Sequence, residues 1–231
     1  MRKEKFENSE IYHIYNRGVE KRNLFSDKKD YYRFIHNLFE FNDEKPVLNI
    51  GYYFNNNPES IQTRPRKLLV EILAFCLMPN HFHLLLRQKV DSGITTFMRK
   101  LGTGYTNYFN QKYTRVGPLF QGVFKSIRII KQSQLLYIPH YIHLNPLDLI
   151  SPKWRENKLR NLEQAITFLD SYKWSSYLDY TGNKNFPSVT NRNYLTEMYG
   201  SGTSIDYKTD LIEWLKNSNT SNELTNNLLL E

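Results

Sequence analysis

The sequence has almost no cysteine and no long apolar run, and these two absences remove several classes of protein. Cys76 is the only cysteine in 231 residues, which excludes a disulfide framework and a zinc site built from thiolates. No apolar run approaches the roughly 20 residues that a membrane-spanning helix requires. The opening stretch, MRKEKFENSE, lacks the apolar segment of a signal peptide. We therefore expect a cytoplasmic protein with no membrane partner.

Acidic residues are also in the minority. The chain has 31 Lys and Arg against 23 Asp and Glu, a formal net charge of +8, which favours an anionic partner such as nucleic acid, although many basic proteins bind none. Tyrosine is abundant, with 17 residues beside 14 phenylalanines. Aromatic rings among cations suit single-stranded nucleic acid, because bases stack on rings. Tyrosine is also common in β-sheets, and composition alone leaves both interpretations open.

Hydrophobic periodicity predicts an α+β fold. We expect strands at residues 11–16, 67–78, 81–88 and within 117–130, with Pro79 and Asn80 forming a tight turn between the second and third. Helices are expected at residues 28–42 after an Asp27 cap, at 92–113 although Gly102 and Gly104 weaken it, and at 133–146. Pro139 lies inside the last of these, and proline fits best in a first turn, so the helical part is expected to begin there. This order describes helices on one face of an antiparallel sheet.

The remaining segments are polar. Residues 51–66 are expected to form a loop, and the chain after Pro152 is expected to be mostly helical, with helices in 161–182 and 207–217. The tail is low in complexity and is expected to fray. The basic run KWRENKLR at 153–160 has two interpretations, phosphate contacts or a solvated charged face.

Two histidines interrupt the oily stretch FCLMPNHFHLLLRQ at residues 75–88. On a strand, His81 and His83 point to one face while Phe82 points to the other. Two neutral imidazoles at this spacing can share a divalent cation if a third ligand comes from elsewhere in the fold. The alternative is a pair of histidines on a half-solvated strand, hydrogen-bonded to their neighbours. The spacing alone does not decide between them.

A second group of candidate residues lies in HYIHLNP. Tyr141 and Asn145 are four residues apart, so both can occupy one face of a helix. A tyrosine hydroxyl is a poor nucleophile near neutral pH, and it becomes useful if its target phosphate is polarised by a metal. The alternative for Tyr141 is an ordinary packed aromatic side chain, which is the usual role in a chain with 17 tyrosines.

Six stretches together resemble one family. They are YHIYNRG near the start, AFCLMPNHFHLLL, FMRKLGTGYTNYFNQKY, GPLFQGVFK, YIHLNP and YKWSSYLDYTG, and they span residues 12–182. The chain thus resembles the single-tyrosine HUH transposases of the IS200/IS605 type, and more closely their branch of REP-associated tyrosine transposases. The pairing of LMPNHFHLLL with a later YIHLNP is specific, whereas a lone His-x-His would not be.

The resemblance implies an α+β fold, a ferredoxin-like (RRM-like) antiparallel sheet with helices on one face, plus a helical C-terminal extension. Residues 1–148 would form the transposase domain and 149–231 the extension packed on it, with a disordered tail from about residue 217. It implies that His81 and His83 bind a metal, Mg²⁺ or Mn²⁺ rather than the zinc that such donors also accept. Tyr141 would be the nucleophile, and Asn145 would complete the metal site where relatives often have glutamine. Asparagine is shorter by one methylene, so its reach to the metal is in doubt.

The implied activity is cleavage and rejoining of hairpin-flanked single-stranded DNA through a 5′-phosphotyrosine intermediate, by a monomer or a homodimer. Further DNA contacts are expected from a set of polar and basic residues: His13, Asn16, Arg17, Lys125 and Arg128. The first three lie in the first strand and its loop, and their alternative role is packing at the end of that strand. Val123 stands where many relatives have arginine, which leaves Lys125 as the nearest cation. His140 and His143 flank Tyr141 but point away from it on a helix, so we expect them to be packing or surface residues.

Two other functions compete with this enzyme. One is a catalytically inactive, domesticated protein that binds hairpins of repeated DNA. The other is a metal-dependent hydrolase without a covalent intermediate, in which Tyr141 would be dispensable. The presence of His81, His83 and Tyr141 together favours the transposase.

Overall fold

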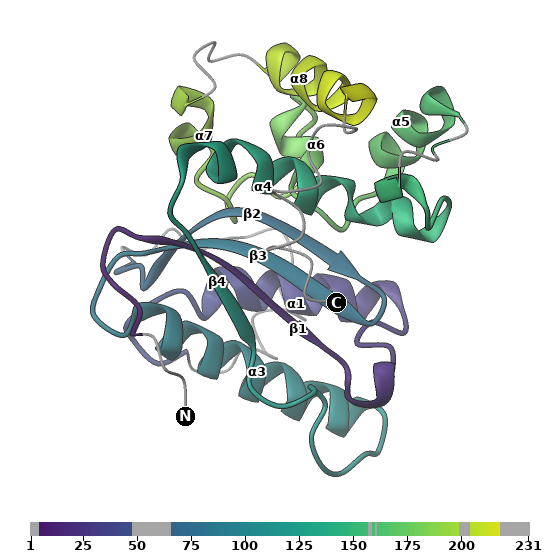
Figure 1. Cartoon of the computed structure of the whole chain (residues 1–231). Helices are drawn as coiled ribbons and strands as arrows, with labels where there is room; N and C mark the ends of the chain where they lie inside the picture. Colours follow the sequence, from purple (N-terminus) through teal and green to yellow (C-terminus); the bar gives the residue numbers. More distant parts are fainter. Residues whose placement is uncertain (1–4, 48–65, 157–158, 160, 199–203, 218–231) are drawn as a thin grey trace.

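A four-stranded antiparallel sheet lies between two layers of helices (Figure 1). The computed structural model describes residues 5–47, 66–156, 159, 161–198 and 204–217. The expected loop at 51–65 and the tail after residue 217 lie outside this range. No helix in the described part of the chain combines the length and the hydropathy needed to cross a membrane.

The sheet has the strand order β2-β3-β1-β4, with every neighbouring pair antiparallel. The strands are β1 (Ile11–Arg17), β2 (Val70–Met78), β3 (His81–Gln88) and β4 (Lys125–Ile129). Helix α1 lies between β1 and β2 and helix α3 lies between β3 and β4, and this order is the expected ferredoxin-like arrangement. The turn at residues 79–80 joins β2 directly to β3, as the sequence predicts.

The first helical layer consists of α1 (Lys28–Glu40) and α3 (Gly93–Lys112), which share an apolar core with one face of the sheet. Asp27 caps α1 as expected, with its side chain accepting a hydrogen bond from the Asp30 amide. The buried carboxylate of Asp30 also accepts hydrogen bonds from hydroxyl and ammonium groups of α3, namely Tyr108 at 3.0 Å and Lys112 at 2.7 Å. These bonds tie the two helices together on this side of the sheet.

The second layer begins with α4 (Gln132–Leu144) and continues into the C-terminal extension (Figure 1). A 3-10 turn at Asn145–Leu149 follows α4. The extension after it contains a 3-10 turn at Trp154–Glu156 and helices α5 (Leu162–Ser171), α6 (Tyr177–Tyr180), α7 (Asn193–Met198) and α8 (Ser204–Asn217). Its buried side chains form one continuous core with α4 and the second face of the sheet. Helices therefore cover both faces, α1 and α3 on one and α4 with the extension on the other.

The extension is also bonded to the outer edge of β2. The Leu77 amide donates to the carbonyl of Trp174 at 2.8 Å, and the Ser176 amide donates to the carbonyl of Phe75 at 3.0 Å. Near the other end of the strand, the Asn191 amide donates to the carbonyl of Ile72 at 2.9 Å. Backbone groups that an edge strand would expose to solvent are thus satisfied by the extension.

The expected start of α4 at Pro139 is wrong, because the helix already begins at Gln132. A proline inside a helix removes one backbone hydrogen bond and crowds the carbonyl one turn earlier. The flanking side chains Tyr137 and Ile138 are 4% and 0% exposed and pack into the core around the sheet. We attribute the survival of the helix through Pro139 to this burial, which sequence periodicity does not reveal.

Two glycines of α3 should respond in opposite directions to alanine. A methyl group at Gly102 would meet no atom within 4 Å, whereas at Gly104 it would lie 2.4 Å from the ring of Phe41. We expect Gly102→Ala to raise the free energy of unfolding by about 1 kcal/mol, since alanine favours helix. We expect Gly104→Ala to lower it by about 1–3 kcal/mol through overpacking. Urea denaturation of both variants measures the two effects, and a stabilised Gly104→Ala would contradict the packing described here.

Candidate active site

The face of the sheet beneath α4 carries the histidine pair. His81 and His83 alternate along β3 with Phe82, which lies in the opposite core. In the antiparallel register of β1 and β3, Tyr15 is the partner of His83 and Arg17 is the partner of His81. Four side chains from two strands therefore share one face, as alternation predicts for each strand separately.

The Nδ1 atom of each histidine has a defined partner on the protein. His83 is 1% exposed, and its Nδ1 lies 2.9 Å from Nε2 of His13, which is equally buried. His81 Nδ1 lies 2.7 Å from Oδ1 of Asn80 in the turn before β3. When Nδ1 donates in each of these bonds, the lone pair of both imidazoles is on Nε2. A hydrogen-bonded Nδ1 is the usual arrangement behind an Nε2 metal ligand.

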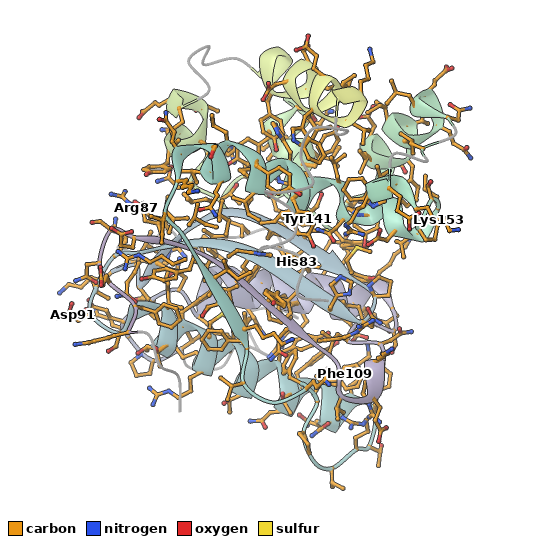
Figure 2. All side chains as sticks on the ribbon, viewed as in Figure 1. His83, Arg87, Asp91, Phe109, Tyr141 and Lys153 are labelled. Carbon is orange, nitrogen blue, oxygen red and sulfur yellow. The ribbon has the colours of Figure 1, made fainter. Side chains whose placement is uncertain are left out.

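Tyr141 of α4 stands over these histidines and is 1% exposed. Its ring centroid is 5.8 Å from that of His83 and 5.9 Å from that of His13, and both contacts are edge-to-face. Figure 2 labels His83 and Tyr141 on facing elements, the sheet and α4. A strand and a helix distant in sequence thus bring together the two imidazole positions and the tyrosine that the sequence singled out.

Asn145, one turn after Tyr141, makes different contacts from those expected of a metal ligand. Its Nδ2 donates to the backbone carbonyl of Tyr141 at 2.8 Å. Its Oδ1, the atom that would bind a cation, accepts a hydrogen bond from Nη2 of Arg155 at 2.8 Å. Asn145 is fully buried and therefore sits between its own helix and a guanidinium group.

Comparison with known proteins identifies the central part of the chain. Residues 34–145 match the family model described as "Transposase IS200 like". This segment is similar to the IS200-like transposases. It contains β3 with its two histidines and α4 with Tyr141.

A solved structure shares the fold of most of this chain. It is described as "Structure of the REP associates tyrosine transposase bound to a REP hairpin", and it matches with a TM-score of 0.51 and 12% sequence identity. The match covers 83% of this chain and 90% of that chain. At this identity the similarity shows the fold alone. No curated protein matches the sequence.

The donors around the transposase site fit a metal only in part. His81 and His83 offer two imidazole nitrogens on one face, which suits a divalent cation. The oxygen of Asn145 accepts a hydrogen bond from Arg155, so a cation bound there would have to share that oxygen with a guanidinium group. Within the described ranges, no group of three or more His, Cys, Asp or Glu side chains could hold a metal ion.

The residues expected to contact DNA have different surroundings in the structure. Arg17 shares the histidine face as the partner of His81, and Lys125 of β4 lies with its ammonium 5.8 Å from the ring centroid of Tyr15. Asn16 donates to the carbonyl of Gly122 at 3.2 Å, at the end of β1. His13, in contrast to the expected strand-edge position, is buried beneath Tyr141 and bonded to His83.

Arg128 lies on the other side of the sheet from the histidines, because it alternates with Ile127, which packs under α4. Its guanidinium group bonds to the carboxylates of Glu7 at 2.8 Å and Glu10 at 3.3 Å. Val123 is 77% exposed. Arg17, Lys125 and Arg155 are cations that lie beside the histidine face or beside Tyr141.

Arg155 is the residue of this region that sequence analysis did not single out. It belongs to the basic run at 153–160, and the charge of that run was the only signal. Its guanidinium carbon lies 5.3 Å from the ring centroid of Tyr141, and Nη1 bonds to the carboxylate of Asp148.

The neighbours of Tyr141 on α4 are packing residues, as expected. His143 is fully buried, with Nε2 bonded to the Ser176 hydroxyl at 2.7 Å and Nδ1 to the Tyr207 hydroxyl at 2.5 Å. Tyr137 packs against Tyr141 and Trp214, and burial raises the pKa of its hydroxyl well above the ordinary range.

Burial of His140 should make the fold sensitive to acid. Burial lowers its pKa from 6.5 to about 3, although the half-exposed carboxylate of Asp210 lies 3.3 Å away, because solvent screens that carboxylate. The unfolded chain binds the proton first as the pH falls. Stability from this neutral imidazole is therefore complete above pH 6.5 and is lost toward pH 3, by up to about 1.4 kcal/mol per pH unit.

The replacement His140→Phe isolates this contribution, since it keeps a ring against Tyr207 and Trp214 but removes the titrating group. Urea unfolding between about pH 7.5 and 5 should show a shallower loss of stability in the variant than in the wild type. Equal slopes would mean that His140 is protonated in the folded protein.

Proposed function

We propose that this protein is a DNA transposase that cleaves and rejoins single-stranded DNA beside hairpins, with Tyr141 as the nucleophile. The observation that carries the proposal is the position of Tyr141. Its ring centroid lies 5.8 Å from that of His83 and 5.9 Å from that of His13. Tyr141 thus lies beside His83, one imidazole of the pair His81 and His83, where a metal held by the pair could assist attack on a phosphate. The similarity of the central segment to the IS200-like transposases supports the same reaction.

In the proposed reaction, the hydroxyl oxygen of Tyr141 attacks the phosphorus of the scissile phosphodiester. A bond forms between this oxygen and phosphorus as the bond from phosphorus to the 3′ oxygen breaks. The phenol gives up one proton and the departing 3′ oxygen gains one, so the products are a 5′-phosphotyrosine and a free 3′-OH. Rejoining reverses these steps and needs no external energy source, because the phosphodiester is conserved.

The residues that would hold a divalent metal are His81 and His83, each through Nε2. Bound there, Mg²⁺ or Mn²⁺ would polarise the phosphate and offset the charge that develops on its oxygens. His13 and Asn80 would keep the two rings in orientation through the bonds to Nδ1. We leave Asn145 out of this ligand set because its oxygen is bonded to Arg155.

Hairpin or single-stranded DNA is the substrate that charge and similarity support. The chain has a formal net charge of +8, and Arg17 and Lys125 lie beside the histidine face. The solved structure with the same fold is of a transposase bound to a REP hairpin. We place the transposase domain at residues 1–148 and the extension at 149–231, the extension completing the site from the side of α4.

A second function, hairpin binding without chemistry, is favoured by one observation. Tyr141 is 1% exposed, and a nucleophile must reach its target phosphate. Cleavage therefore requires the strand to approach between α4 and the histidine face, or the side chain of Tyr141 to turn outward. The formation of a covalent adduct distinguishes the two functions.

Tyr141→Phe should bind hairpin DNA as the wild type does but form no covalent adduct. The change removes only the hydroxyl and keeps the buried ring, so the fold should lose about 1 kcal/mol or less. Tyr137→Phe is the matched control, since Tyr137 lies one turn earlier on the same helix and stacks on Tyr141 at 6.0 Å. The assay uses labelled single-stranded hairpin DNA from the flanks of the gene with Mg²⁺ or Mn²⁺, followed by denaturing electrophoresis.

Peptide mass spectrometry of the trapped adduct then locates the nucleotide. Attachment to Tyr137, or to another tyrosine, would refute the assignment. Absence of an adduct from the wild type would favour the binding protein, and cleavage by Tyr141→Phe would favour a hydrolase.

His81→Ala and His83→Ala should each abolish adduct formation and weaken Mn²⁺ binding at least about tenfold, while hairpin affinity stays within a few fold. Asn145→Ala should leave Mn²⁺ affinity nearly unchanged, because its oxygen is bonded to Arg155. His36→Ala is the control, since His36 lies on α1 at the opposite face of the sheet. Calorimetric titration with Mn²⁺ measures the affinities, and full adduct formation by His81→Ala would rule out the metal role.

A further inference from the structure

The guanidinium group of Arg155 is framed by four side chains, those of Tyr141, Asn145, Asp148 and Trp154. Its Nη2 donates to Oδ1 of Asn145 at 2.8 Å, and its Nη1 donates to the carboxylate of Asp148. The guanidinium carbon lies 5.3 Å from the ring centroid of Tyr141 and 4.6 Å from that of Trp154. The indole of Trp154 also bonds to the same oxygen of Asp148, at 2.7 Å. A planar guanidinium group with these contacts has little rotational freedom left.

The side chains of this frame differ in their exposure to solvent. Tyr141 is 1% exposed and Asn145 is fully buried, whereas the side chain of Arg155 is 20% exposed. The side chain of Arg155 is therefore partly open to solvent, next to a tyrosine that solvent barely reaches. A phosphate at the hydroxyl of Tyr141 would lie close to this cation.

The carboxylate of Asp148 does not make this cation unsuitable for an anion. Asp148 Oδ1 is shared with the indole of Trp154, so a single oxygen accepts from two donors. A carboxylate behind an arginine fixes the direction of the guanidinium plane, and arginine offers five N–H donors in that plane. Two hydrogen bonds in parallel from such a plane match the oxygens of a phosphate.

We propose that Arg155 binds the phosphate that Tyr141 attacks, and that Asn145 and Asp148 orient the guanidinium group for this contact. The inference rests on the proposed function and adds a catalytic residue from the C-terminal extension. As the phosphorus passes from the 3′ oxygen to the tyrosine oxygen, negative charge grows on the phosphate oxygens, and a fixed cation beside them stabilises it. Asn145 has the role of a positioning residue for Arg155.

The test compares a charged phosphate with a neutral one. Cleavage by the wild type first maps the scissile phosphate in hairpin DNA from the flanks of the gene. The same oligonucleotide is then made with a methylphosphonate at that position, which removes the negative charge and keeps the size. Binding of both oligonucleotides is measured in the Tyr141→Phe protein without divalent cations, so that only charges of the chain contribute.

Tyr141→Phe should bind the phosphate oligonucleotide about tenfold more tightly than the methylphosphonate, a typical effect of one charged contact. In Tyr141→Phe with Arg155→Gln, the ratio should fall to between one and about threefold. Arg192→Gln is the matched control, since Arg192 is another arginine of the extension and donates to the carbonyl of Pro187 at 2.9 Å. The control should keep the tenfold ratio. An undiminished ratio in the Arg155→Gln protein overturns the proposal.

A second measurement needs no variant at position 155, in case glutamine there disturbs the fold. An arginine-specific dicarbonyl reagent modifies exposed guanidinium groups, and peptide mass spectrometry reports the extent at Arg155. The phosphate oligonucleotide should protect Arg155 at least about threefold better than the methylphosphonate at equal occupancy. Equal protection overturns the proposal. Adduct formation by the wild type distinguishes failure of the proposed function from failure of the role of Arg155. If the wild type forms no adduct, the proposed function is refuted. If it forms an adduct but Arg155→Gln leaves the binding ratio unchanged, only the role of Arg155 is refuted.

Discussion

Antiparallel pairing between β1 and β3 sets Tyr15 opposite His83 and Arg17 opposite His81, and the whole site depends on this register. Side chains alternate along each strand, so a shift by one residue would send the histidines into the opposite core and Phe82 toward α4. That shift is prevented by burial, because Phe82, Leu84 and the neighbouring apolar side chains fill the core under α1 and α3. The same alternation that builds one core therefore presents the imidazoles on the other face.

The second face is completed by elements that are not part of the ferredoxin-like order. α4 lies across β2 and β3, and the extension bonds to the free edge of β2 through backbone groups at Ile72, Phe75 and Leu77. These contacts cover most of the face, and His83, His13 and Tyr141 are enclosed as a result. Enclosure strengthens every electrostatic interaction within the site, since water no longer screens it. It also requires each buried polar group to have a partner, and His13, Asn145 and His143 show how this is met.

Asn145 illustrates how one methylene changes the partner of an amide. A longer side chain could extend past the helix toward the histidines, whereas asparagine bonds back to the carbonyl of Tyr141 and outward to Arg155. The positive charge of the guanidinium group lies beside the tyrosine ring in consequence. The guanidinium group in this part of the site is a fixed positive charge that suits an anion. The two imidazole nitrogens of His81 and His83, in the other part, suit a metal cation.

Local patterns in the sequence determined the sheet, its order of elements and the candidate residues. Alternation placed His81 and His83 on one face of a strand, the Asp27 cap marked the start of α1, and the tight turn at Pro79 and Asn80 joined β2 to β3, because each depends only on neighbours in the chain. Helical spacing put Tyr141 and Asn145 on one face for the same reason.

Contacts between distant segments were decided by the tertiary structure alone. Sequence periodicity could not show that His13 would be buried against His83, since that requires the register of two strands 70 residues apart in sequence. It could not show that α4 continues through Pro139, because the compensating burial comes from the sheet and the extension. Nor could it separate Arg155 from the other basic residues around it, because the position of its guanidinium group is set by Asp148, Asn145 and Trp154, on irregular turns that no periodic pattern encodes.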